Sequence, residues 1–287
     1  FAQENGFLRI DNIFNSVFVI MSWMAIMAIG QTIVIISGGI DISVGSIMGL
    51  TSFVTALVLL KFPADAPAWE VLPVGIGVPL GVGLLCGLIN GLLVVGLRMH
   101  PFIVTLATLS IFRWVPEKLG SIYGATQPFG DQPIPVAFTD KFIEYELKYS
   151  QYGGRHILVL DLVPILIMLL CLAAGWIYLR YTVWGRETYA IGGNEEAARY
   201  SGIRLPWVKL RVYCLSGLSA GIAGMLIVGF YKAASTDTGT GYELTVIAAA
   251  AVGGASLTGG RGTALGAVLG MLVLQLIEDG IFVLGKL

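Results

Sequence analysis

Few residues in this sequence could take part in covalent chemistry, and their spacing forms no known catalytic arrangement. The two histidines, His100 and His156, lie far apart and lack metal-ligand spacing. The three cysteines, Cys86, Cys171 and Cys214, each lie in an apolar run, where a thiol is typical of packing. There is no H-E-x-x-H motif and no Ser-His-Asp order in a supporting context. We therefore expect a protein that is not an enzyme and has no metal site or cofactor of its own.

One segment near the end of the sequence imitates a phosphate-binding loop. Residues 280–286 fit G-x-x-x-x-G-K, but Leu287 follows where the motif requires Ser or Thr. The intervening residues are bulky and apolar, whereas a phosphate cradle needs exposed backbone N–H groups after a strand. We therefore expect that this chain does not itself bind ATP.

The composition limits the class of protein. Hydrophobic residues make up 56% of the 287 residues and charged residues only 12%, against roughly 25% charged in a soluble domain. So little charge cannot cover a water-soluble particle, which excludes a soluble enzyme. The net charge of −1 comes with no basic stripe, so we expect no nucleic-acid partner. The composition predicts an all-α polytopic protein of the lipid bilayer, forming one transmembrane domain over residues 1–287.

Apolar runs bounded by charged residues, glycine or proline divide the chain into about eight membrane segments. These segments are 14–36, 43–60, 71–97, 102–120, 157–179, 212–230, 244–252 and 264–284. Glycines four residues apart lie on one helix face and let a neighbouring helix approach closely. The pairs predicted to do so are Gly77/Gly81, Gly83/Gly87, Gly87/Gly91, Gly217/Gly221, Gly262/Gly266 and Gly266/Gly270.

Basic residues predict the orientation of these segments. The loop 181–211 is the most charged part of the chain, so the positive-inside rule places it in the cytoplasm, with Arg98 and Arg261 on the same side. Alternation then places three loops outside: 61–70, 121–156 and 232–243.

The outer loop 121–156 is periplasmic in this arrangement, and we expect a short amphipathic helix in it at about 140–149. Residues 1–13 also fall outside. We therefore expect one further helix before Phe1 and another after Leu287.

Asp41 is the acid in the most unusual setting, because it follows a Gly-Gly break between two apolar runs. Ionisable residues at membrane depth are costly and are usually functional. Two interpretations stay open: Asp41 caps the helix that follows, or it lines a translocation pathway. Polar residues within other spans are typical of interhelical hydrogen bonds, and one or two can line a polar route. These residues are Gln31, Asn90, Thr105, Thr108 and Gln275.

Two glycine-rich segments, 38–45 and 253–260, resemble each other, since both follow an apolar run and precede a helix. Duplicated halves with broken helices near the pathway are common in transporters. Glycine-rich segments also match by chance, so an internal repeat and a coincidence both stay open.

The cytoplasmic segment 185–203 is the most informative stretch. Asn194 can cap a short helix that Gly202 ends. The residues that follow the cap are two glutamates, which favour the helix dipole, and two small residues: Glu195, Glu196, Ala197 and Ala198. A two-turn helix with small residues outward suits docking into a groove on a partner. The alternative is an ordinary capped connector.

Four motifs, spread in order over almost the whole chain, resemble the permease subunit of bacterial ABC importers for monosaccharides, of the ribose/xylose/galactose type. They are G-G-I-D-I-S-V-G-S (38–46), H-P-F-I-V-T-L-A-T-L-S-I (100–111), G-R-E-T-Y-A-I-G-G-N-E-E-A-A-R-Y-S-G-I (185–203) and G-G-A-S-L-T-G-G-R-G-T (253–263).

This resemblance implies a multi-pass protein of the bacterial inner membrane with the ten-helix fold of the vitamin-B12-importer type (type II). It also implies a homo- or heterodimer of permeases, two ATPase subunits that bind ATP, and a periplasmic sugar-binding protein. The segment 194–202 then corresponds to the coupling helix that enters the ATPase. The residues assigned to coupling are Gly185, Arg186, Tyr189, Asn194, Glu195, Glu196, Ala197, Ala198, Ser201 and Gly202. Those assigned to the translocation pathway are Asp41, Ser43, Asn90, Phe102, Thr105 and Thr108.

The sequence departs from this family at 114–118 and in the outer loop 121–156, which is longer and more charged. Both lie on the side expected to meet the binding protein, so they bear on partner and sugar identity. Permeases for branched-chain amino acids or nucleosides are the closer alternative. An ion-driven secondary transporter is the more distant one, because such proteins place paired carboxylates at mid-membrane. The acids available for that role are Asp41, Glu278 and Asp279.

Overall fold

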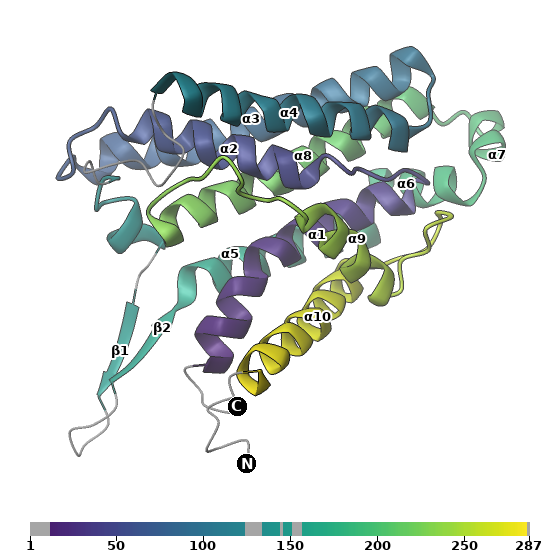
Figure 1. Cartoon of the computed structure of the whole chain (residues 1–287). Helices are drawn as coiled ribbons and strands as arrows, with labels where there is room; N and C mark the ends of the chain where they lie inside the picture. Colours follow the sequence, from purple (N-terminus) through teal and green to yellow (C-terminus); the bar gives the residue numbers. More distant parts are fainter. Residues whose placement is uncertain (1–11, 124–133, 144–145, 151–156, 286–287) are drawn as a thin grey trace.

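Long apolar helices account for most of the structure (Figure 1). The computed structural model describes residues 12–123, 134–143, 146–150 and 157–285. The helices in chain order are the π-helical η1 (Asn12–Val19), α1 (Ile20–Ile36), α2 (Val44–Leu59), α3 (Ala68–Leu97), α4 (Pro101–Tyr123), the π-helical η2 (Thr139–Ile143), α5 (Leu162–Tyr181), α6 (Val183–Gly193), α7 (Glu195–Tyr200), α8 (Leu205–Tyr231), α9 (Tyr242–Val252) and α10 (Ala264–Leu284). Two strands, β1 (Glu146–Ser150) and β2 (Ile157–Asp161), pair between η2 and α5.

The helices confirm a polytopic membrane fold and divide the predicted membrane segments into complete spans and shorter helices. Among the described residues, five helices are long and apolar enough to cross a bilayer: η1 with α1, α3, α5, α8 and α10. The predicted segments at 43–60 and 244–252 are the shorter helices α2 and α9, of 16 and 11 residues. At 1.5 Å per residue they reach only about 24 Å and 17 Å, less than the ~30 Å hydrocarbon core. Both begin after a non-helical segment, as broken helices do.

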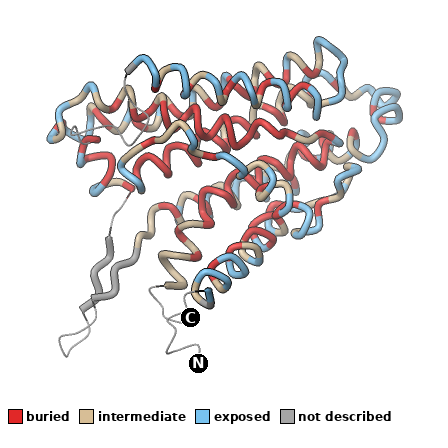
Figure 2. Tube along the Cα trace, viewed as in Figure 1, coloured by how far each residue is buried: buried red, intermediate tan, exposed pale blue. Residues whose placement is uncertain are grey.

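Helices α1 and α8 form the centre of the bundle. Nearly every residue of α1 is buried, and α8 packs on α1, α2 and α3. Figure 2 shows the buried residues concentrated along these central helices, with exposed residues on the outer faces of α3, α5 and α10. Those outer faces carry large apolar side chains such as Leu85, Leu170 and Ile281. An apolar outer face is the arrangement that a lipid environment requires.

Two glycine stripes bring α3 and α8 into backbone contact, as their spacing predicts. A Cβ added at Gly83 would overlap the Gly217 carbonyl oxygen, and one at Gly87 would overlap that of Tyr213. Gly81 differs, because no atom of another residue lies within 4 Å of the position a Cβ would take. The same is true of Gly77, so the predicted packing role of the Gly77/Gly81 pair is wrong within this chain. A second stripe, Gly266 and Gly270 on α10, meets the end of α9, so that predicted pair does pack closely. Gly262 precedes α10 and is not helical, so the predicted placement of Gly262 and Gly266 on one helix face is wrong.

The outer loop differs from the prediction of an amphipathic helix at 140–149. The described part instead contains η2 and a hairpin in which Glu146 is paired with Asp161 and Ser150 with Ile157. The sequence I-L-V-L-D at 157–161 is apolar enough to resemble the start of a span, yet β-branched and aliphatic residues also suit a strand. The fifth span therefore begins at Leu162 rather than at 157, and its 20 residues still suffice to cross the core.

The close approach of α3 to α8 gives a direct test. Gly87→Ala should lower the thermal midpoint of the purified protein by several degrees, since the new methyl group meets backbone that cannot yield. Gly81→Ala is the matched control and should leave the midpoint unchanged or slightly raised. Equal midpoints for the two variants would contradict the assigned packing.

Candidate functional site

The chain interrupts its helices at a glycine-rich break between α1 and α2. Gly38 has φ of +83°, a left-handed conformation that ends α1. The Gly38 N–H donates to the Ile35 carbonyl at 2.9 Å, and the Gly39 N–H donates to Val34 at 3.1 Å. This pair of bonds is the Schellman arrangement that closes a helix C-terminus.

The end of α9 repeats this local geometry. Gly254 has φ of +90°, its N–H donates to Ala251, and the Ala255 N–H donates to Ala250, both at 2.9 Å. The bonds span the same numbers of residues as those at the end of α1. The two glycine-rich segments therefore share a backbone conformation as well as a sequence pattern, but many helices end in this way, so a repeat and a coincidence both stay open.

Side chains from other helices satisfy the backbone of the α1–α2 break. The Thr105 hydroxyl of α4 accepts from the Ile42 N–H at 3.1 Å and lies 3.2 Å from the Ile40 carbonyl. The Gln31 amide of α1, oriented to satisfy both its atoms, bonds the N–H and the carbonyl of Asp41. Unpaired backbone groups at membrane depth cost several kcal/mol each, roughly, so these contacts hold the break in place.

The Asp41 carboxylate joins the break to α8. One oxygen accepts from the Ser43 hydroxyl at 2.6 Å and from the Ser43 N–H at 3.0 Å. The other accepts from the Ser216 hydroxyl at 2.8 Å. Asn90 of α3 donates to the Ser43 hydroxyl at 2.7 Å. All four side chains are buried. We call Gln31, Asp41, Ser43, Asn90, Thr105 and Ser216 the polar network.

Asp41 makes a contact of the kind expected of a helix cap. Its carboxylate accepts from the N–H of Ser43, two residues later, whose backbone is already helical (φ −78°, ψ −4°) at the start of α2. The same carboxylate also bonds Ser216 of a second helix, α8. Its role in this state is to hold the break against α8.

Two buried polar atoms beside the network have no hydrogen-bond partner in the part of the chain that the structure describes. They are the Asn90 side-chain oxygen and the Tyr213 hydroxyl. The Tyr213 hydroxyl lies directly against Gly39, where a Cβ would be only 2.7 Å away. Buried polar groups without partners are uncommon and indicate a place where a water or a solute hydroxyl can bind.

The segment predicted to be cytoplasmic folds as two short helices, α6 and α7, on the right of Figure 1. Asn194 caps α7 by accepting from the Ala197 N–H at 2.9 Å, as predicted. Gly202, with φ of +83°, ends the helix, and the Ile203 N–H donates to Ala198 at 3.1 Å. Of the two alanines, Ala197 is exposed but Ala198 is buried, so only one of them faces outward as expected.

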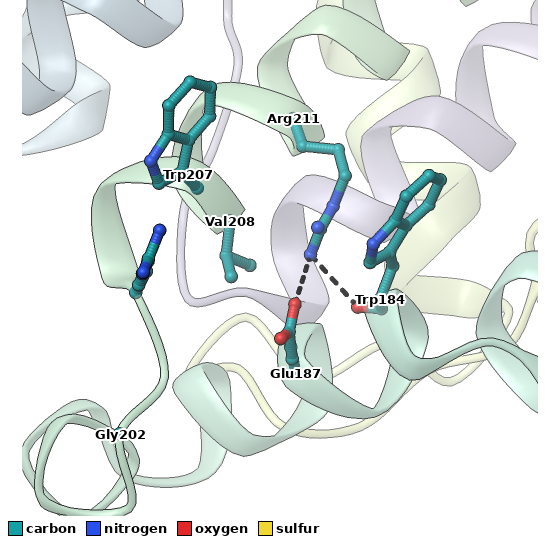
Figure 3. Close-up of a pocket in the computed structure, with 7 residues that line it drawn as sticks. Trp184, Glu187, Gly202, Trp207, Val208 and Arg211 are labelled. Atoms are coloured by element: carbon teal, nitrogen blue, oxygen red, sulfur yellow. Dashed lines mark hydrogen bonds and ion pairs between the residues drawn. The ribbon is translucent and has the colours of Figure 1, made fainter.

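Ion pairs hold these helices on α8. Arg211 donates to Glu187 at 2.8 Å and lies over the Trp184 ring at 5.2 Å, so that α6 and α8 are joined (Figure 3). Lys209 pairs with Glu195 of α7 at 2.8 Å. Both pairs are partly exposed, so each contributes little stability alone, but together they fix the orientation of the segment.

A backbone junction connects α6 to both glycine-rich segments. A Cβ at Gly192 would overlap the Ile36 carbonyl oxygen, and the same oxygen accepts from the Gly260 N–H at 2.9 Å. Gly259 packs against Gly192 and Gly38. We call these five residues the glycine junction.

Tyr189 supports the glycine junction from α6. Its hydroxyl donates to the Gly262 carbonyl at 2.6 Å. Burial raises the pKa of the Tyr189 phenol, partly opposed by the nearby Arg180, so the hydroxyl keeps its proton and remains a donor.

Comparison with known proteins shows the family to which this chain belongs. Residues 12–286 match the family described as the branched-chain amino acid transport system / permease component. The chain belongs to this permease family. It is 36% identical to the ribose import permease protein RbsC of Escherichia coli over 282 residues, which are 98% of this chain and 80% of that protein.

Other relatives have the same range of similarity. The ribose import permease protein RbsC of Bacillus subtilis is 37% identical over 91% of this chain and 74% of its own length. The autoinducer 2 import system permease protein LsrD of Yersinia enterocolitica is 34% identical over 91% and 73%. No solved structure matches the chain.

The family match and these relatives show that the chain is the multi-pass transmembrane permease subunit of an ABC importer in the bacterial inner membrane.

The structure places the predicted residues of the permease in distinct environments. Of the pathway residues, Asp41, Ser43, Asn90 and Thr105 meet in the polar network, and Thr108 bonds Thr105 one turn along α4. Phe102 is 42% exposed on the outer face of α4 and does not join them. Of the coupling residues, Gly185 and Ala198 are buried and Tyr189 is half-buried. The remaining coupling residues are exposed: Arg186, Asn194, Glu195, Glu196, Ala197, Ser201 and Gly202.

The polar network predicts a specific loss of stability. Asp41→Ala should lower the free energy of unfolding in detergent by roughly 2 kcal/mol or more, because three buried donors lose their acceptor. Asp65→Ala, in an exposed outer loop, is the control and should be neutral. A denaturation series would refute the network's role if both variants unfolded at the same midpoint.

Proposed function

We propose that this permease translocates a monosaccharide by alternating access, driven by an ATPase that docks on the exposed face of α7. The observation that carries the proposal is the glycine junction. It joins the helix preceding α7 directly to the break that holds the polar network. A displacement of α7 therefore reaches buried polar groups through backbone contacts alone. A dimeric partner permease and a periplasmic sugar-binding protein complete the proposed importer.

The polar network supports a neutral, hydroxyl-rich substrate. Each Asp41 oxygen is already hydrogen-bonded to donors within the chain, so neither oxygen is free to bond a charged solute directly. The free acceptor on Asn90 and the free hydroxyl on Tyr213 suit sugar hydroxyls, which both donate and accept. The relatives named for ribose and autoinducer 2 support the same class of small polar solute. A zwitterionic amino acid would need paired charges at this place.

An ion-driven mechanism finds less support. Asp279 accepts from Asn12 at 2.8 Å, near the far end of α10, and Glu278 is exposed. Neither acid contacts Asp41, so the described residues do not form the mid-membrane carboxylate pair that such a mechanism uses.

Reconstituted transport tests the proposed function. The permease, combined with its ATPase and binding protein in liposomes, should take up a pentose or hexose against a gradient only when ATP is supplied. Ala197→Trp, on the exposed face of α7, should abolish uptake while membrane insertion is retained. The control is Ala173→Trp on the outer face of α5, which should transport normally. Uptake of leucine but of no sugar would refute the substrate class, and uptake driven by an ion gradient without ATP would refute the mechanism.

The glycine junction offers a second test with adjacent residues. Gly192→Ala should reduce ATP-driven uptake at least tenfold, because the methyl group would push α6 away from the Ile36 carbonyl. Gly193→Ala is the matched control, since no other residue lies within 4 Å of its added Cβ. ATPase activity of the assembled complex is measured alongside, and we expect hydrolysis to persist without transport in the first variant only. Normal uptake by both variants would contradict the transmission route.

A further inference from the structure

A groove at the cytoplasmic ends of α3 and α8 takes no part in the polar network or the glycine junction. Its volume is about 760 Å³. Val94 and Val95 of α3 and Leu205 at the start of α8 form its apolar wall. A concave apolar wall that opens at the end of a membrane helix can receive part of an amphipathic molecule.

The rim of the groove is basic and unneutralised. Arg98, Arg199 and Arg204 line it with exposed side chains, and none of them has a hydrogen-bond or ion-pair partner within the described ranges. The one acid among the lining residues, Glu195, is already paired with Lys209 at 2.8 Å. The groove therefore carries an excess of positive charge that calls for an anionic occupant.

The groove has features expected of a site at the level of lipid headgroups. Helix α3 has 30 residues and a length of about 45 Å, longer than the ~30 Å hydrocarbon core, and the charged Arg98 directly follows its last turn. Trp207, another lining residue, is 63% exposed in the first turn of α8, a position typical of tryptophan at a membrane interface. Val95 shares a helix face with Leu92, which is exposed on the apolar side of α3. The groove is thus continuous with the lipid-facing surface.

We propose that this groove binds the phosphate headgroup of an anionic phospholipid from the cytoplasmic leaflet, with an acyl chain along the α3 face of Val95 and Leu92. Guanidinium groups bind phosphate through paired hydrogen bonds, and two or three arginines around one concavity suit a phosphodiester. The lipid would connect the end of α3 to α7, because Arg98 and Arg199 approach the groove from these two elements. Bound lipid would then stabilise the position from which α7 meets its partner.

Native mass spectrometry tests lipid binding without any transport measurement. The protein is purified with its associated subunits in mild detergent, delipidated, and titrated with phosphatidylglycerol or with phosphatidylcholine of the same acyl chains. We expect retention of phosphatidylglycerol and little retention of phosphatidylcholine. The double variant Arg98→Gln/Arg204→Gln should weaken phosphatidylglycerol binding about tenfold or more. Arg98→Lys/Arg204→Lys should keep most of the binding.

Arg261→Gln is the matched control, since Arg261 is an exposed arginine on the same side of the membrane but outside the groove. It should bind phosphatidylglycerol as the unmodified protein does. Equal retention of the two lipids, or undiminished phosphatidylglycerol binding in the double glutamine variant, would overturn the proposal. Displacement of the lipid by millimolar inorganic phosphate would also overturn it, because the groove would then be a simple anion site. These outcomes are independent of whether a sugar is transported.

Discussion

The constraint on which this structure depends is that backbone groups at membrane depth must find partners inside the protein. The chain leaves helical geometry between α1 and α2, where Asp41 is fully buried and its backbone N–H and C=O groups lack the partners that a helix would give them. Thr105 and Gln31 supply the missing bonds to the backbone of the break, and Asp41 supplies the bond to Ser43. The polar side chains of the bundle are therefore located where the helix is broken. A break supported from α1, α4 and α8 cannot shift without moving those helices or leaving polar groups unpaired.

In the proposed cycle, glycine residues also transmit movement through this apolar protein. Where Gly192 meets Ile36 and Gly260, backbone lies on backbone, and no side chain can change rotamer to absorb a displacement. Packed interiors of this density respond by discrete shifts and not by gradual deformation. Between α3 and α8, the glycine stripes instead bring two long helices into contact along their length, which favours rigid packing. The same residue type thus favours rigid packing in one part of the bundle and, in the proposed cycle, couples another.

The sequence predicts the helices and their packing stripes better than it predicts where a membrane span begins. Residues 71–97 and 264–284 emerge as the helices α3 and α10, because composition and flanking residues report directly on length. The short lengths of α2 and α9 also follow from the sequence, because glycines and charged residues bound the apolar runs 43–60 and 244–252. Apolar character alone does not distinguish strand β2 from the start of a span at 157–161, because aliphatic residues suit both.

Within the functional site, local capping signals were accurate and long-range partners were missed. Asn194 begins α7 and Gly202 ends it, as expected, because a cap depends on residues adjacent in sequence. Ser216 was not foreseen, since a serine in a helix of small residues is typical of packing until the fold shows that it faces Asp41. The burial of Ala198 likewise depends on how a six-residue helix lies on α8, which its own sequence does not encode.

The state of Asp41 links the energetics of the site to the proposed cycle. In this conformation Ser43 and Ser216 occupy both carboxylate oxygens, so the acid is stabilised internally and is unavailable to a solute. Because Ser216 belongs to α8 whereas Asp41 and Ser43 both precede α2, separating these helices would remove the Ser216 donor from a buried carboxylate, at a substantial cost. A hydroxyl group of a sugar would replace that donor without adding charge. A neutral polyol would thus lower the cost of opening, whereas an apolar solute would leave that Asp41 oxygen unpaired and an anion would oppose it. The polar network would therefore both support the break between α1 and α2 and favour the passage of neutral polyols.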